Sequence, residues 1–457
     1  MKKYPLSSAQ RLHFYTMKYC PKKQVLNIGT SLVVKIDIDW EDLKKAIYKA
    51  YERCESMRLR FGEDENGEIY QYIADKEERD IEFFDFTGWR TEDAENKMRE
   101  WTETPFERYH TPLNKVVMIV TPDNYKGIYL LVDHMTMDAQ SLIVFLKDVI
   151  ELYCNIKFEG VPYPKEMYSY IEQLEKDLEY ETNSKKYEKD KKFFNELLNE
   201  SEPIFCSIEG KDVLNKDKRS VSNITDNTDA NITVFNLEEE PSRRLMNFCT
   251  ENNVSMVSLL MMGLRTYLQK MNNIDDVSIM TSIARRATIN EKRCGGTRIH
   301  FFPCRTIVDG SKNFLEGIEE IKKVQNLLFH HADYDPIKVL AERRSIYNLE
   351  NGETYEPLSL TYQPLTMKQS NSKTVDTINF SDIDYKTNWY SNGVCAHALY
   401  LTVMHRANDN GLSFNFEYQT GRIGYGQLEY LYYYLCKILF VGIENPNLSI
   451  NEIINRV

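Results

Sequence analysis

The residues best suited to chemistry lie in segment 130–141, which reads LLVDHMTMDAQS. A strand is predicted to end at Asp133 and a helix to begin near Ala139, so that the loop between them carries His134 and Asp138. A neutral imidazole is poised near pH 7 to take the proton of an amine or hydroxyl that attacks a thioester carbonyl. It could instead act by orientation and electrostatics. The loop is therefore a candidate for acyl transfer at His134, although on spacing alone a histidine followed four residues later by an aspartate more often belongs to a loop without a catalytic role.

The neighbouring acid has two structural roles open to it. Asp138 can cap the helix that follows, or it can pair with an arginine and fix the loop. Either role would hold the imidazole of His134 in place. The catalytic interpretation requires that this imidazole reach a solvent channel.

The elements around this loop alternate between helix and strand. Apolar residues at helical spacing predict a helix over 40–55, and the hairpin signal after it predicts strands over 57–61 and 69–73. Two further strands, 116–121 and 128–132, lead to a predicted helix over 139–153. The loop with the histidine thus follows directly from a strand.

The second half of the chain repeats this alternation. Residues 166–200 are predicted as solvated helices with Phe193, Phe194, Leu197 and Leu198 as their buried stripe, and the polar stretch 207–232 as an irregular loop. Helices are then predicted over 254–271, 314–329 and 428–441, and strands over 277–284, 399–404 and 412–418. Strand and helix alternation on both sides of a mid-chain loop predicts two similar lobes.

Composition narrows the classes of function. A chain of 457 residues with 42% hydrophobic and 28% charged residues is expected to fold as two lobes. The net charge of -12 argues against general nucleic-acid binding. The nine cysteines form no C-x-x-C pair, which disfavours a disulfide framework or a metal site and fits a cytoplasmic protein. We find no signal peptide and no apolar run of about eighteen residues, so no membrane partner is expected.

Several segments resemble, in order, the motifs of condensation domains of nonribosomal peptide synthetases, relatives of chloramphenicol acetyltransferase. Residues 7–12 (SSAQRL) are similar to S-x-A-Q-x-R-L, and residues 53–61 (RCESMRLRF) to R-H-E-x-L-R-T-x-F. Residues 133–139 take the place of H-H-x-x-x-D-G, residues 296–305 (GTRIHFFPCR) resemble G-F-F-V-N-T-L-P-L-R, and Tyr362–Gln363 resembles the end of S-Y-Q. The likeness runs nearly end to end, and the order and spacing of the motifs carry it.

The resemblance implies an α/β (α+β) fold of two chloramphenicol acetyltransferase-like lobes in a V-shaped pseudo-dimer, with a tunnel between them. The N-terminal lobe, residues 1–180, would carry the D-H-x-x-x-D-A motif, and residues 181–457 would form the C-terminal lobe. Donor and acceptor would arrive on the phosphopantetheine arms of acyl or peptidyl carrier proteins, or the donor on CoA. No intrinsic cofactor and no metal are expected, and the chain is expected to be a monomer.

The resemblance also assigns roles to residues. His134 takes the position of the second, catalytic histidine, and Asp138 that of the structural aspartate, whose expected partner is Arg286. His300 stands at the asparagine position and is a candidate for lining the tunnel, although it could equally pack beside its phenylalanine neighbours. Tyr362 and Gln363 are further tunnel candidates. A second H-H-x-x-x-D spelling over residues 330–335 follows a predicted helix and is interpreted as a helix end.

Departures from the motif leave alternatives open. Asp133 replaces the first histidine, and Ala139 replaces a glycine, which would be unfavourable if that position needed positive φ. Asp133, Asp138 and Ser141 also fit D-x-x-x-x-D-x-x-S, the pattern of heterocyclization domains. A heterocyclization domain and an ordinary condensation domain would be distinguished by whether both Asp133 and Asp138 face the tunnel.

The predicted function is a condensation-type acyltransferase that joins a carrier-bound acyl thioester to an amine or hydroxyl acceptor in nonribosomal peptide-like biosynthesis. The alternatives are a heterocyclization domain, an acyl-CoA-dependent acyltransferase, and a catalytically inactive scaffold that binds carrier proteins. No adenylation or carrier domain is recognised, so we expect a free-standing enzyme or an excised domain.

Overall fold

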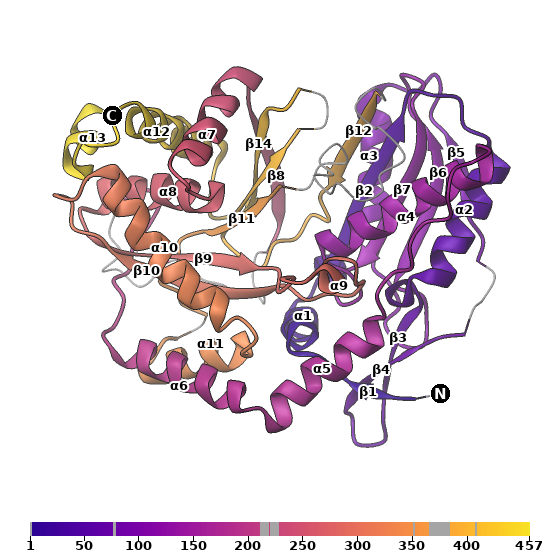
Figure 1. Cartoon of the computed structure of the whole chain (residues 1–457), viewed down its shortest axis with the longest axis horizontal. Helices are drawn as coiled ribbons and strands as arrows, with labels where there is room; N and C mark the ends of the chain where they lie inside the picture. Colours follow the sequence, from indigo (N-terminus) through magenta and orange to yellow (C-terminus); the bar gives the residue numbers. More distant parts are fainter. Residues whose placement is uncertain are drawn as a thin grey trace. The chain divides into compact units, whose positions relative to one another are not determined.

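The structure is a computed structural model that describes residues 2–75, 79–210, 219, 228–350, 352–364, 384–406 and 409–457. The chain divides into two compact units, and Figure 1 labels most of their elements. Unit 1 comprises Met1–Asn183, Ala284–Ile299 and the described part of Leu365–Gly393, and unit 2 comprises Ser184–Ile283, His300–Pro364 and Val394–Val457. The first division, after residue 183, falls near the expected boundary at 180, but unit 1 also includes two segments from later in the chain.

Unit 1 is built on a five-stranded sheet in the order β12-β2-β7-β6-β5. Its strands are β2 (Asn27–Val34), β5 (Glu82–Asp85), β6 (Asn114–Val120), β7 (Lys126–Asp133) and β12 (Tyr385–Tyr390). The neighbouring helices are α2 (Trp40–Arg53), α3 (Thr91–Glu103) and α4 (Ala139–Lys157). Strand β7 is central and buried along its length after Lys126, which explains its nearly continuous apolar sequence. Met98 and Ala94 of α3 pack on this sheet against Tyr129.

A smaller sheet completes unit 1, in the order β1-β4-β3. Its strands are β1 (Tyr4–Pro5), β3 (Leu59–Glu63) and β4 (Ile69–Ile73), and beside them are η1 (Lys23–Leu26), η2 (Glu55–Arg58), α1 (Ser8–Tyr19), α5 (Tyr170–Asn183) and α9 (Ile289–Lys292). A core of buried residues joins this sheet to α1, α5 and the segment after α9; it contains Leu59, Met17, Tyr170 and Cys294. Met135, from the loop after β7, belongs to the same core, so the loop is packed against these elements.

Unit 2 is built on a six-stranded sheet in the order β10-β9-β11-β13-β14-β8. Its strands are β8 (Ala230–Leu237), β9 (Asp276–Ile283), β10 (His300–Ile307), β11 (Ser359–Gln363), β13 (Leu399–His405) and β14 (Leu412–Gln419). Its helices are α6 (Lys185–Asn199), α7 (Glu239–Glu251), α8 (Met256–Asn272), α10 (Phe314–His330), α11 (Pro336–Ile346), α12 (Tyr425–Glu444) and α13 (Ile450–Arg456). Helix α8 is buried on almost all sides, and a Cβ at Gly263 would lie 2.7 Å from Leu435 of α12, so glycine permits this close packing.

The strands and helices expected around the site are present, with ends that differ by a few residues. The buried stripe expected before unit 2 is present in Phe194 and Leu198, while Phe193 and Leu197 are only partly buried. The stretch 207–232 is not wholly irregular, because β8 begins at Ala230; most of the rest of it lies outside the described residues. In the described part of the chain, no helix combines the length and apolar character needed to cross a membrane.

Candidate functional site

The loop that carries His134 is closed by its own hydrogen bonds and attached to two other segments. The carbonyl oxygen of Asp133 accepts hydrogen bonds from the amides of Thr136 at 2.9 Å and Met137 at 3.3 Å. The amide of Asp133 donates to Leu113 O at 2.9 Å, and that of His134 to Leu26 O at 2.8 Å. The path of the backbone at His134 is therefore set by these hydrogen bonds.

Asp138 fixes the other end of the loop. It is the N-cap of α4, with its Oδ1 accepting from the amide and the hydroxyl of Ser141, each at 2.9 Å. Nη2 of Arg286 donates to both carboxylate oxygens at 3.0 Å, and the amide of Arg298 donates to Oδ2 at 2.9 Å. Burial alone would raise the pKa of Asp138, but Arg286 and these hydrogen bonds outweigh it, and the pKa is lowered from 3.8. The buried pair expected between Asp138 and Arg286 is present.

Arg286 is held from several sides. Its Nη1 donates to the carbonyl oxygens of Glu291 and Cys294, both at 2.7 Å, while Nη2 also reaches Ser141 Oγ and Gly296 O, both at 2.8 Å. Segment 284–299 of unit 1 is thus fastened to the start of α4 through one guanidinium.

Asp133, which stands where the family motif has its first histidine, is fully buried and forms an ion pair with Arg108. Its Oδ1 accepts from the amide of Met135 at 2.9 Å, and Arg108 also donates to Lys23 O at 2.6 Å. The side chain of Asp133 therefore helps to hold the loop in place. Ala139 is the first residue of α4 and is not among the residues with positive φ, so the replacement of glycine there causes no backbone strain.

His134 is partly exposed, although its Nδ1 is buried and has no hydrogen-bond partner among the described residues. Burial lowers the pKa of His134 from 6.5, and the interaction with its own backbone and the nearby charge of Asp138 only partly oppose this. The imidazole is therefore neutral at pH 7 and able to accept a proton. Its ring is stacked on that of His13, with 4.0 Å between centroids and 25° between planes.

Residues of helix α1 lie beside the loop because the start of this helix is hydrogen-bonded to it. Ser7 and Gln10 form a capping box, and Gln10 Nε2 donates to Met135 O at 3.2 Å. His13 lies three residues further on the same helix face and contacts the loop at His134. The sequence reasoning missed His13; the i, i+3 spacing from Gln10 is a signal that could have indicated it.

The tunnel candidates belong to unit 2. His300 is fully buried, its Nδ1 lies 2.8 Å from Ala332 O, and its ring meets Phe302 edge-on, which supports the packing alternative. Tyr362 is half-buried, with its hydroxyl 2.6 Å from His405 Nε2, and Gln363 is the last residue of β11. The structure brings Asp133, His134, Asp138, Ser141 and Arg286 together within unit 1.

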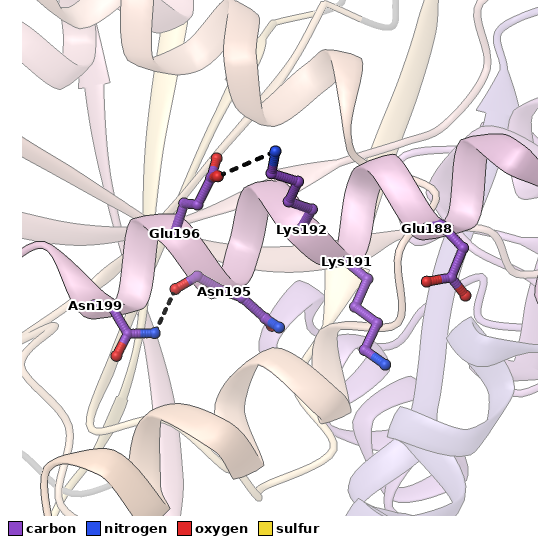
Figure 2. A pocket seen from close by; sticks show the side chains of 6 residues that line it. All are labelled: Glu188, Lys191, Lys192, Asn195, Glu196 and Asn199. Atoms are coloured by element: carbon purple, nitrogen blue, oxygen red, sulfur yellow. Dashed lines mark hydrogen bonds and ion pairs between the residues drawn. The ribbon is translucent and has the colours of Figure 1, made fainter.

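Unit 2 carries a second histidine pair and a hollow on one helix. The second H-H-x-x-x-D sequence is a helix end: His330 is the last residue of α10, and His331 stacks on Phe193 and lies 2.7 Å from Asp190. A shallow hollow on α6 is shown in Figure 2 and is lined by Glu188, Lys191, Lys192, Asn195, Glu196 and Asn199. Among the described residues, no cluster of three or more side chains is suited to hold a metal ion.

The fold is mixed α/β with two chloramphenicol acetyltransferase-like lobes, as found in solved condensation domains. The first condensation domain of the calcium-dependent antibiotic synthetase, in complex with a substrate analogue, matches with a TM-score of 0.80, 17% identity and 99% of each chain covered. The starter condensation domain of rhizomide synthetase, in complex with C8-CoA, matches with a TM-score of 0.81, 17% identity and coverage of 98% of this chain and 97% of that one.

The profile of the Condensation domain family matches residues 1–454, so this chain belongs to that family. Surfactin synthase subunit 1 of Bacillus subtilis (strain 168) is 26% identical over 463 residues, which cover 98% of this chain and 12% of that protein. Bacitracin synthase 3 of Bacillus licheniformis is 23% identical over 452 residues, covering 98% of this chain and 7% of that protein. The chain therefore spans only a small part of the length of these relatives.

Proposed function

We propose that this chain is a condensation-type acyltransferase in which His134 assists the attack of an amine on a carrier-bound acyl thioester. The observation that carries the proposal is a partly exposed, neutral imidazole at the motif position of the catalytic histidine. Because Nδ1 is buried, Nε2 is the nitrogen that we assign to proton transfer.

The reaction exchanges one acyl bond for another. The amine nitrogen of the acceptor forms a bond to the thioester carbonyl carbon, and Nε2 of His134 takes the proton that the nitrogen loses. The tetrahedral intermediate then collapses, the carbon–sulfur bond breaks, and the phosphopantetheine sulfur leaves with that proton as a thiol. The products are an amide and a free thiol, and no oxidant or metal is needed.

The aspartates support condensation over heterocyclization. Asp133 is buried against Arg108, and Asp138 is 3% exposed and bonded to Arg286, Ser141 and the amide of Arg298. Both carboxylates are thus occupied in holding the loop, and neither is available to a substrate hydroxyl or thiol without breaking a buried ion pair.

The test is an acylation assay read by intact-protein mass spectrometry. A panel of acyl-phosphopantetheinyl carrier proteins is incubated with aminoacyl carriers in the presence of the wild-type chain or of the His134→Ala variant. We expect a mass gain on the acceptor carrier with the wild type, and a rate at least about a hundredfold lower with the variant. Equal rates would refute the role of His134.

Two further arms separate the alternatives. With octanoyl-CoA in place of the donor carrier, product formation would identify a CoA-dependent acyltransferase, which the complex of the rhizomide synthetase domain with C8-CoA makes a reasonable probe. With cysteinyl, seryl or threonyl acceptors, an additional loss of water would identify heterocyclization. Carrier binding by wild type and variant alike, with product from neither, would favour a scaffold.

A further inference from the structure

His13 is a residue that neither the family motif nor the proposed chemistry uses, yet its ring contacts the imidazole of His134. The two rings are 4.0 Å apart and 25° from parallel, which is a stacked arrangement. His13 is only 6% exposed, so it is a fixed part of the interior. One face of His134 is therefore covered by a second imidazole.

Acid–base histidines are commonly oriented by a hydrogen bond to the ring nitrogen that does not react. His134 differs, because its Nδ1 has no hydrogen-bond partner in the described part of the chain. The carboxylates of the same loop do not take this part: Asp133 is paired with Arg108, and Asp138 with Arg286. The stacked ring of His13 is a contact that can limit rotation of the imidazole.

The helix that carries His13 is anchored to the same loop. Gln10 Nε2 donates to Met135 O at 3.2 Å and to Gln71 Oε1 at 2.8 Å, and the capping box of Ser7 and Gln10 fixes the start of the helix. His13 follows Gln10 by one helical turn, so the distance from its ring to the loop is set by this buried amide.

We propose that His13 is a positioning residue, which holds the ring of His134 by stacking and keeps Nε2 in the orientation that proton transfer requires. This inference rests on the proposed function, because it assumes that His134 takes a proton. The interaction depends on contact between two flat rings. An aromatic side chain at position 13 therefore maintains it, and an aliphatic side chain of similar size does not.

The experiment compares three substitutions at position 13 in the carrier-based acylation assay. His13→Leu and His13→Gln remove the ring, and we expect each to lower kcat by about three- to tenfold with KM unchanged, the range that corresponds to an aromatic pair. His13→Phe restores the ring and is expected to remain within about twofold of the wild type. His331→Leu is the matched control, because it removes a stacked histidine from unit 2 and should leave kcat unchanged.

A second measurement is independent of turnover. In protein labelled at histidine Cε1, the NMR signal of His134, assigned by its loss in His134→Ala, should show a ring-current shift that His13→Leu abolishes and His13→Phe retains. Unchanged kcat and shift in both ringless variants would overturn the inference, as would a loss in His13→Phe as large as in His13→Leu. If His134→Ala is fully active, the proposed function fails instead, and the NMR shift still reports whether the rings are stacked.

Discussion

The ion pair between Asp138 and Arg286 provides the sharpest test of how the loop is held. The side chains are 4% and 3% exposed, so removing the carboxylate leaves a buried guanidinium without a counter-charge. Loss of one partner of such a pair destabilises a protein by about 3–5 kcal/mol. Asp138→Ala also removes the cap of α4, a loss of about 1 kcal/mol that partly overlaps with the first.

The expected shift in melting temperature follows from the size of the unit. At about 2–4 °C per kcal/mol, Asp138→Ala should lower the unit 1 transition by roughly 6–20 °C. Asp138→Asn keeps the shape and the capping oxygen but loses the charge, so we expect a loss of about 1.5–3 kcal/mol. Differential scanning calorimetry is the appropriate measurement, because a chain of two units need not unfold in one step.

The pH dependence has a defined sign. Since the folded-state pKa of Asp138 is lowered from 3.8, its contribution is fully present above that value and is lost as the pH falls through the lower, folded-state pKa. The difference between wild type and Asp138→Ala should therefore be constant from pH 7 to pH 5 and shrink below about pH 4.

Asp148 offers a matched control in the same unit. It also pairs with an arginine, Arg53, at 3.0 Å, but burial outweighs that partner, and the pKa of Asp148 is raised from 3.8. Asp148→Asn should therefore shift the transition much less than Asp138→Asn does. Equal shifts for the two asparagine variants, or a shift of less than about 2 °C for Asp138→Ala, would refute the reasoning.

Three other outcomes can be measured. Because the pKa of His134 is lowered from 6.5, the acylation rate should rise with pH and reach half its plateau below pH 6.5; a midpoint above 7 would contradict this. Burial raises the pKa of Glu417 from 4.5 to about 7, so this group should destabilise unit 2 increasingly as the pH rises above 4.5. Glu417→Gln should therefore stabilise unit 2 by at most about 3 kcal/mol at pH 8, measured as a higher melting temperature, and should have little effect near pH 4. Gly296→Ala should lower the unit 1 transition markedly, because φ there is +89° and a Cβ would collide with the Tyr170 ring; an unchanged melting curve would show that the loop relaxes.

The strand, loop and helix that carry His134 could be predicted because their signals are local. The apolar run of β7 and the helical spacing after Ala139 are each readable within a few turns of chain. The pair of Asp138 with Arg286 spans 148 residues and was accessible only through the family resemblance. Asp133 with Arg108 was not predicted, because no periodicity connects a buried acid to a base 25 residues earlier.

Strand β12 of unit 1 has no local sequence pattern from which a strand could be predicted. Strand β12 reads YKTNWY, without the apolar alternation of a half-buried strand, and it pairs with β2 through contacts such as Thr30 Oγ1 to Asn388 O, 358 residues apart. Its place at the edge of the sheet explains the polar sequence, because little of it needs to be buried. Long-range pairing of this kind is decided by the tertiary structure and not by propensity.

The departures from the family motif are consistent with a loop that is rigid by other means. A histidine at position 133 would occupy a fully buried site. The aspartate that stands there forms an ion pair with Arg108 and accepts a hydrogen bond from the Met135 amide. Replacing it with aspartate thus exchanges one structural group for another and leaves His134 as the ionisable side chain of the motif that is partly exposed. Arg286 holds the far end of the loop through Asp138, and α1 contacts the loop through Gln10 and His13, so residues outside the motif help to fix the loop that carries the imidazole. The residue types in the motif are therefore a weaker guide to activity than the contacts that His134 makes.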